Sequence, residues 1–189
     1  LMYWQVYRHK TVVASENMLV KIIERAQLLF AQKNEQVKTG ALLDNFLNNP
    51  NINIEHLALN DYCNLDDTDI LHAIKKWQHH TDPILSLLCK GLLNRKCFKC
   101  QIQSEPIEDA QWINALNKTK EKYAFNEQDI AFLCFKGTVS NTLYKNDNET
   151  IKILLKSGEI ANISAIQNAL IVESLSAPVK KFYICSLNE

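Results

Sequence analysis

The chain has 189 residues, of which 47% are hydrophobic and 22% are charged, and its formal net charge is +0. This composition is typical of a soluble globular protein with one large or two small domains, and it excludes disordered and fibrous proteins. Because the charge is balanced, we expect no broad attraction to nucleic acid or to an anionic membrane. No apolar run is long enough to cross a membrane, and the first residues do not follow the signal-peptide pattern, so we expect a cytoplasmic protein.

The first predicted element is a long helix over residues 11–31. Its apolar residues recur at helical spacing and cover more than one narrow stripe, which predicts a largely buried central helix. They are Val12, Val13, Leu19, Val20, Ile22, Ile23, Ala26, Leu29 and Phe30. Such a helix needs neighbours on several sides, and the chain starts with Leu1 rather than Met, so we expect it to be a piece of a longer protein. If this helix is left uncovered, we expect homo-oligomers to form through it.

The rest of residues 1–95 is also predicted to be helical. A short helix over 41–47 ends at an Asn-Asn-Pro turn, and a loop is expected through residues 54–64. An acidic first turn after Leu65 predicts a helix that runs to about His80. Asp82 followed by Pro83 predicts the start of the next helix. Residues 1–95 are therefore interpreted as one helical lobe.

The hydrophobic pattern changes after residue 95. The predicted elements are a strand over 98–102, a helix over 106–123, strands over 130–135 and 151–155 with a turn at 146–148, a short helix over 163–170 and a last strand over 181–185. The order βαββαβ is that of a split βαβ motif, which predicts a small ferredoxin-like lobe over residues 96–189. The predicted fold class is mainly α, with an α+β second lobe.

The cysteines offer one pattern that is typical of a metal site. Cys97 and Cys100 form a C-x-x-C pair, and a zinc site would need a second pair of ligands, for which His79 and His80 are the nearby candidates. Adjacent histidines on a helix point about 100° apart, so they chelate one ion poorly. We therefore favour a strand with alternating exposure over a zinc site, and we expect this chain to bind no metal.

Two basic clusters lie at predicted element ends. Tyr7, Arg8, His9 and Lys10 place a phenol, a guanidinium, an imidazole and an ammonium within one helical turn, which suits a phosphorylated ligand with a base or sugar. The alternative is an ordinary solvated helix end.

The second basic cluster lies at the junction of the two predicted lobes. Residues 94–99 include three cations where a helix passes into a strand, and this junction can direct Arg95 and Lys99 at one anion. The alternative is a basic helix end that complements the helix dipole.

Taken together, three segments resemble the C-terminal half of HD-superfamily phosphohydrolases. They are residues 7–10, residues 65–70 and residues 93–99. The similarity is to the SAM-and-HD-domain deoxynucleoside triphosphate triphosphohydrolases and their bacterial relatives, and it covers residues 2–100, while the second lobe matches only in element order. It implies the helical C-terminal part of an HD domain and assembly into dimers or tetramers.

The resemblance also implies roles for individual residues. Tyr7 would pack on the substrate sugar, with Arg8 beside it where animal members have Gln. His9 and Lys10 would line a regulatory nucleotide site at subunit contacts, and the Arg95 and Lys99 side chains would hold phosphates of a regulatory nucleotide.

The catalytic metal motif of the resembled family is missing from this sequence. That motif needs a His, a His-Asp dipeptide and a later Asp, which hold a divalent ion that activates water. None of the five histidines is followed by Asp. We therefore expect no catalytic residue in this chain, a divalent metal site in an upstream part, and an inactive 189-residue fragment.

The predicted function of the whole protein is hydrolysis of a deoxynucleoside triphosphate to the nucleoside and triphosphate. An alternative is a non-catalytic regulatory or oligomerisation module in an HD protein that acts on another phosphate ester. A third possibility is an unrelated helical adaptor without a ligand. A His-Asp dipeptide upstream of Leu1 would support the first two hypotheses.

Overall fold

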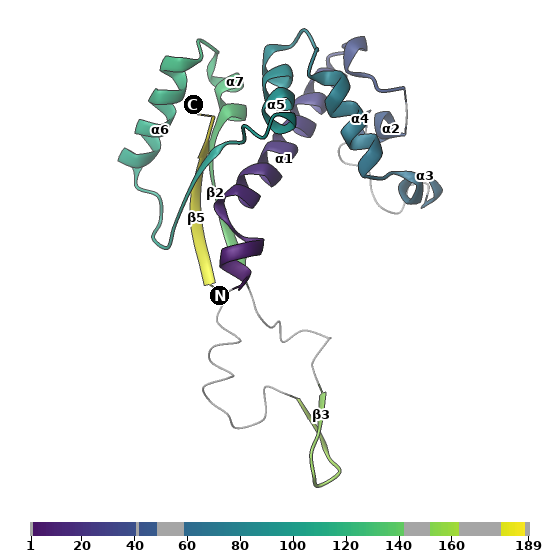
Figure 1. The fold of residues 1–189 in the computed structure, drawn as a ribbon, viewed down its shortest axis with the longest axis vertical. Helices are drawn as coiled ribbons and strands as arrows, with labels where there is room; N and C mark the ends of the chain where they lie inside the picture. Colours follow the sequence, from purple (N-terminus) through teal and green to yellow (C-terminus); the bar gives the residue numbers. More distant parts are fainter. Residues whose placement is uncertain (1, 41, 49–58, 142–151, 163–178, 188–189) are drawn as a thin grey trace.

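The computed structural model describes residues 2–40, 42–48, 59–141, 152–162 and 179–187 (Figure 1). The helices are η1 (Tyr3–Tyr7), α1 (Lys10–Ala31), η2 (Glu35–Val37), α2 (Leu43–Asn48), α3 (Leu59–Asn64), α4 (Asp67–Trp77), α5 (Pro83–Leu93), α6 (Asp109–Lys122) and α7 (Glu127–Leu133). The strands are β1 (Lys99–Gln103), β2 (Cys134–Asn141), β3 (Lys152–Leu154), β4 (Ile160–Asn162) and β5 (Val179–Ser186). None of the helices that the structure describes has the length and apolar character needed to cross a membrane.

Helix α1 is central, with strands on one side of it and helices α2 and α4 on the other (Figure 1). It packs against α5, β1 and α2. Close approach to α5 depends on Gly91, where an added Cβ would lie 2.5 Å from Met18 Cε. The buried residues of α1 follow one face, whereas Leu19, Val20 and Leu28 are 36%, 50% and 41% exposed. The prediction that α1 is largely buried is therefore wrong at these three positions.

Local signals determine where α4 and α5 begin. Asp66 caps α4 by accepting hydrogen bonds from Thr68 N and Asp69 N, and the Asp69 side chain bonds back to Asp66 N. Asp82 caps α5 by accepting from Leu85 N at 2.8 Å, with proline at the first helical position. Both predicted helix starts are confirmed.

The predicted loop over 54–64 is wrong in its described part, because residues 59–64 form α3. This helix buries no side chain, and its Leu59 and Tyr62 are 75% and 61% exposed. Without a buried face there is no apolar periodicity from which the helix could have been predicted.

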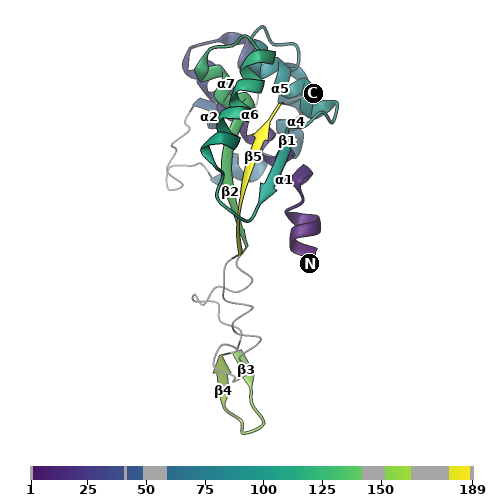
Figure 2. The same cartoon turned by 90° about the vertical axis from the view of Figure 1, so that its left-hand side faces the viewer.

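The main sheet is antiparallel and has the strand order β1-β5-β2. Helix α1 packs on β1 from one side, and α6 packs on β5 and β2 from the other (Figure 2). The buried apolar cluster is continuous from α1 and α5 to the sheet. The sheet is therefore a layer between α1 and α6.

The predicted strand over 130–135 is wrong for most of its length. Residues 127–133 form α7, which Asn126 caps by accepting from Asp129 N at 2.8 Å, and β2 starts only at Cys134. Ile130 and Leu133 are buried at a spacing of three residues, which is helical. A short apolar run fits either period, so tertiary packing decided this element.

The ferredoxin-like arrangement is not confirmed. The strands near 98–102 and 181–185 form as predicted, but β3 pairs with β4 in a separate two-stranded sheet instead of joining the others. The predicted turn at 146–148 and the helix over 163–170 lie outside the described residues. Among the described residues the chain is a mainly helical α+β structure with a small antiparallel sheet.

Candidate functional site

The four residues of the first basic cluster lie at the break between η1 and α1. Tyr7 ends η1 and is 55% exposed, while His9 has an extended backbone with φ −61 and ψ 143 and caps α1. The four side chains therefore do not share one helical turn, which corrects the sequence prediction. The reason is local, because an N-cap residue has non-helical backbone angles.

The side chains of this cluster are largely open to solvent. His9 Nδ1 accepts from Thr11 N at 3.3 Å, so a neutral His9 carries its proton on Nε2 and presents a donor outward. Arg8 Nη1 lies 3.9 Å from Glu16 Oε2 in an exposed pair. Lys10 lies on the α1 side of β1. The pKa of the Cys100 thiol is lowered mainly by a hydrogen bond from Cys185 and to a smaller extent by the Lys10 charge.

The second basic cluster follows the end of α5. Arg95 has φ +59, and Lys96 N donates to Gly91 O at 2.8 Å, which closes the last helical turn. This left-handed position usually favours glycine, and a longer side chain there costs roughly 1–2 kcal/mol. An exposed arginine at a strained position is a reason to look for function there.

The structure separates Lys99 from Lys10. Lys99 and Gln101 are exposed on β1, whereas Cys100 between them is buried in the core with α1. Lys99 therefore faces α6, and Lys10 lies at the opposite face of the same strand. Arg95 and Lys99 remain close in sequence, at opposite ends of the short connection from α5 to β1.

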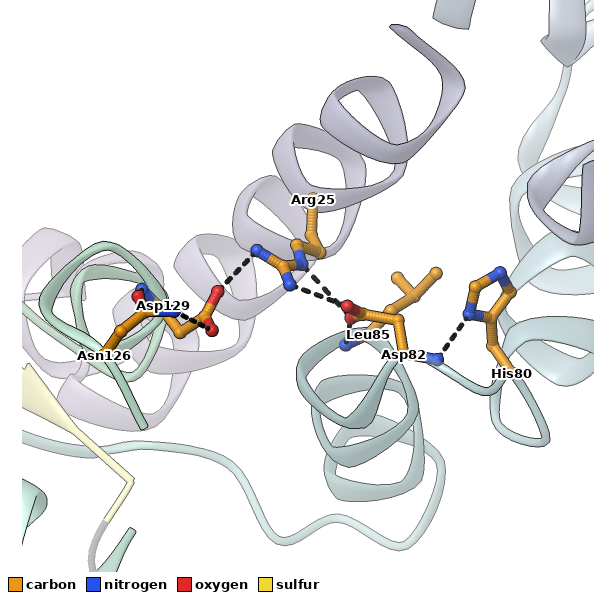
Figure 3. Close-up of polar contacts among 6 residues, drawn as sticks. All are labelled: Arg25, His80, Asp82, Leu85, Asn126 and Asp129. Carbon is orange, nitrogen blue, oxygen red and sulfur yellow. Dashed lines mark hydrogen bonds and ion pairs between the residues drawn. The ribbon is translucent and has the colours of Figure 1, made fainter. Parts of the chain in front are cut away.

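A third polar group, not anticipated from the sequence, is the buried Arg25 cluster, formed by Arg25, Asp82 and Asp129 (Figure 3). Arg25 Nε and Nη2 donate to the two Asp82 oxygens at 3.1 and 2.6 Å, and Nη1 donates to Asp129 Oδ1 at 2.7 Å. The guanidinium also lies 5.2 Å from the Phe132 ring centroid. This cluster joins α1, the start of α5 and α7.

The opposite charges of the Arg25 cluster stabilise one another in their ionised forms. Burial raises the pKa of the Asp82 carboxyl, but the hydrogen bonds from Arg25 and Leu85 N and the Arg25 charge outweigh it, so the net pKa is below its usual range. Asp129 also accepts from Asn126 Nδ2 at 2.8 Å. Such a satisfied, buried group is structural in character. A polar Arg25 on the apolar face of α1, four residues from Leu29, was the sequence signal that could have revealed it.

His80 adjoins the Arg25 cluster (Figure 3). Its Nδ1 accepts from Asp82 N at 2.9 Å, so the neutral ring carries its proton on Nε2. That Nε2 is buried and has no hydrogen-bond partner among the described residues. Burial lowers the pKa of His80, and the Asp82 charge opposes this only in part.

The described residues do not fit a metal ion. Within residues 2–40, 42–48, 59–141, 152–162 and 179–187, no three His, Cys, Asp or Glu side chains converge on one point. Cys100 hydrogen-bonds with Cys185 across the sheet, and Arg25 engages the Asp82 and Asp129 carboxylates. No catalytic step through a metal can be assigned to these residues.

The chain is similar in fold and sequence to a phosphohydrolase of known structure. A phosphohydrolase of known crystal structure from Bacteroides thetaiotaomicron is similar to it, with a TM-score of 0.79 and 32% identity over 98% of this chain and 47% of that protein. The uncharacterized protein YwfO of Bacillus subtilis (strain 168) is 28% identical over 179 residues, which is 93% of this chain and 39% of that protein. No protein-family model matches. The chain thus spans less than half the length of both relatives.

Proposed function

We propose that this chain is the C-terminal region of a metal-dependent HD-superfamily phosphohydrolase that cleaves a deoxynucleoside triphosphate to the nucleoside and triphosphate. The observation that carries this proposal is the similarity to the Bacteroides phosphohydrolase, at 32% identity over 98% of the chain. The substrate class comes from the resemblance of residues 7–10, 65–70 and 93–99 to the deoxynucleoside triphosphate triphosphohydrolases. The proposal includes a cytoplasmic location.

In this proposal the described residues bind the nucleotide and do not carry out the chemistry. The exposed Tyr7 ring packs on the substrate sugar, with Arg8 beside it. The outward Nε2–H of His9 and the Lys10 ammonium contact a regulatory nucleotide. Arg95 and Lys99 hold phosphates of a regulatory nucleotide, and the fold separates Lys99 from Lys10. The divalent metal and its His and Asp ligands belong to a part of the protein outside this chain, where the metal would activate water.

The decisive experiment compares the 189-residue chain with a longer protein that includes the upstream reading frame. We expect the longer protein to retain a stoichiometric divalent metal and to release triphosphate from a deoxynucleoside triphosphate, and the short chain to do neither. Metal analysis and a triphosphate-release assay measure both properties. Turnover by the short chain with bound metal would place the catalytic site inside it and contradict the proposal.

A second test uses the strained backbone of Arg95. In the longer protein, Arg95→Gly removes the guanidinium but relieves a positive φ of 59°, so its stability should hold or rise by up to about 1 kcal/mol. Loss of a charged phosphate contact should weaken nucleotide binding by roughly tenfold. Calorimetry measures affinity and urea denaturation measures stability. Unchanged affinity would leave Arg95 with a role at the helix end alone.

One observation favours the alternative, a non-catalytic oligomerisation module. Leu19, Val20 and Leu28 on α1 are exposed, and apolar surface of this kind is often covered in an assembly. We propose that the chain forms homo-oligomers through the exposed side of α1 around Val20. Light scattering should show a species larger than a monomer at high micromolar concentration, and Val20→Lys should shift it toward the monomer. A clean monomer in the parent protein would contradict this.

A further inference from the structure

A cavity of about 390 Å³ lies between α6 and the face of the sheet that is turned away from α1. Its sheet side consists of two directly opposed pairs, Lys99 with Ser186 and Gln101 with Ile184. Its helix side comes from α6 residues three or four positions apart, which therefore share one helix face. These are Gln111, Asn114, Ala115, Lys118 and Lys122. We call this cavity the α6 pocket.

The charge of the α6 pocket is of one sign. Three lysines from two different elements line it, and no Asp or Glu is among the lining residues. Within the described part of the chain, neither Lys99 nor Lys118 forms an ion pair, while Lys122 also lies over the Tyr123 ring at 5.4 Å. Like charges gathered around one cavity repel one another, and the remaining polar lining offers amides and a hydroxyl but no countercharge.

A helix-dipole effect explains only part of this arrangement. Cations in the last turn of α6 complement the helix C-terminus, which accounts for Lys120 and Lys122. Lys120 satisfies its charge with Glu127 at 2.9 Å, and it does not line the pocket. The dipole does not explain why Lys99, from a strand on the opposite wall, shares the cavity with Lys118.

We propose that the α6 pocket binds an oligophosphate, meaning a ligand with two or three linked phosphates. A single phosphate carries about −1.5 to −2 charge, so three ammonium groups are better matched by a longer phosphate chain. The volume of about 390 Å³ lies within the range of small-molecule sites. The amides of Gln101 and Asn114 can hydrogen-bond phosphate oxygens or an attached polar group. The proposal rests on the proposed function only through Lys99, and Lys118 and Lys122 extend that site onto α6.

Inorganic triphosphate is the probe, titrated calorimetrically into the 189-residue chain at low salt. Lys118→Gln should weaken its binding by about tenfold, and the double variant with Lys122→Gln by more, because each removes a charge-assisted contact. Lys120→Gln is the matched control, since it removes the same charge from the same helix outside the pocket, and it should leave the affinity unchanged. Circular dichroism melts verify that all variants are folded.

Three results would overturn the proposal. The parent chain could fail to bind triphosphate, or the double variant could bind it as tightly as the parent chain. The third is an equal loss of affinity in Lys120→Gln, which would indicate a diffuse charge effect. The outcome is separable from that of the proposed function. Triphosphate binding needs no catalytic metal, so it can be lost or retained independently of triphosphate release by the longer protein.

Discussion

The Arg25 cluster and the α6 pocket use the same kinds of charged side chain in opposite ways. In the Arg25 cluster one buried guanidinium meets two carboxylates at hydrogen-bond distance, and the group ties three helices together. In the α6 pocket three exposed ammonium groups surround a cavity whose lining has no carboxylate. The charges of the first are paired with one another, whereas the lining of the second brings like charges to one cavity, where we propose that a ligand binds. Pairing and burial, more than the presence of charge, therefore distinguish a structural cluster from a binding site.

The largest effect is expected from breaking the closed cluster. Arg25→Ala leaves two largely buried carboxylates, 10% and 18% exposed, without their cation, so the free energy of unfolding should fall by about 3–5 kcal/mol, measured by urea denaturation. Arg8→Ala is the control, because it removes the same side chain from an exposed 3.9 Å pair and should cost less than about 1 kcal/mol. Equal losses of unfolding free energy in the two variants would mean that the Arg25 cluster stabilises the fold no more than an exposed ion pair does.

A smaller effect separates the two carboxylates of the cluster. Asp82 accepts two hydrogen bonds from Arg25 and also caps α5, whereas Asp129 accepts one from Arg25. Asp82→Asn should therefore cost about 2–3 kcal/mol and Asp129→Asn about 1–2 kcal/mol, since bonds to a charged group are worth about 1.5–3 kcal/mol. Urea midpoints of the two variants give the order. The reverse order would mean that Asp129 is the principal partner of Arg25.

His80 adds a pH dependence to the closed cluster. Burial lowers its pKa in the folded chain, so the unfolded chain binds a proton first as the pH falls below about 6.5. The free energy of unfolding should therefore decline as the pH falls through about 6.5, and the decline should continue down to the lower pKa of folded His80. His80→Asn keeps an acceptor for Asp82 N and cannot titrate, so this decline should be absent. Parallel pH profiles in the two proteins would exclude His80 as its source.

The smallest effect belongs to the open pocket. Lys118→Glu replaces one of three like charges with an opposite one, so the unliganded chain should become more stable by about 0.2–0.5 kcal/mol. Stabilisation on altering a binding site is expected where like charges are held together for a ligand. Thermal unfolding at low salt measures it. A loss of stability would indicate that Lys118 serves the fold.

Local chemistry in the sequence was sufficient for several elements. Asp66 and Asp82 predict the starts of α4 and α5 because a capping side chain acts within three residues of itself. The long periodic pattern of α1 predicted its type and length. The basic junction after α5 was visible as composition, but its left-handed Arg95 was not.

Tertiary structure decided what depends on residues that are far apart in the chain. The sequence could not distinguish α7 from a strand over 130–135, because a short apolar run fits both periods until it packs. It could not pair Arg25 with Asp129, which lie 104 residues apart, or place Lys99 opposite Lys118 across a cavity. Such contacts depend on how the sheet and helices assemble. The sequence by itself therefore determined the starts of α4 and α5 and the basic character of the candidate sites, and the assembled fold determined which charges pair with one another and which line a common cavity.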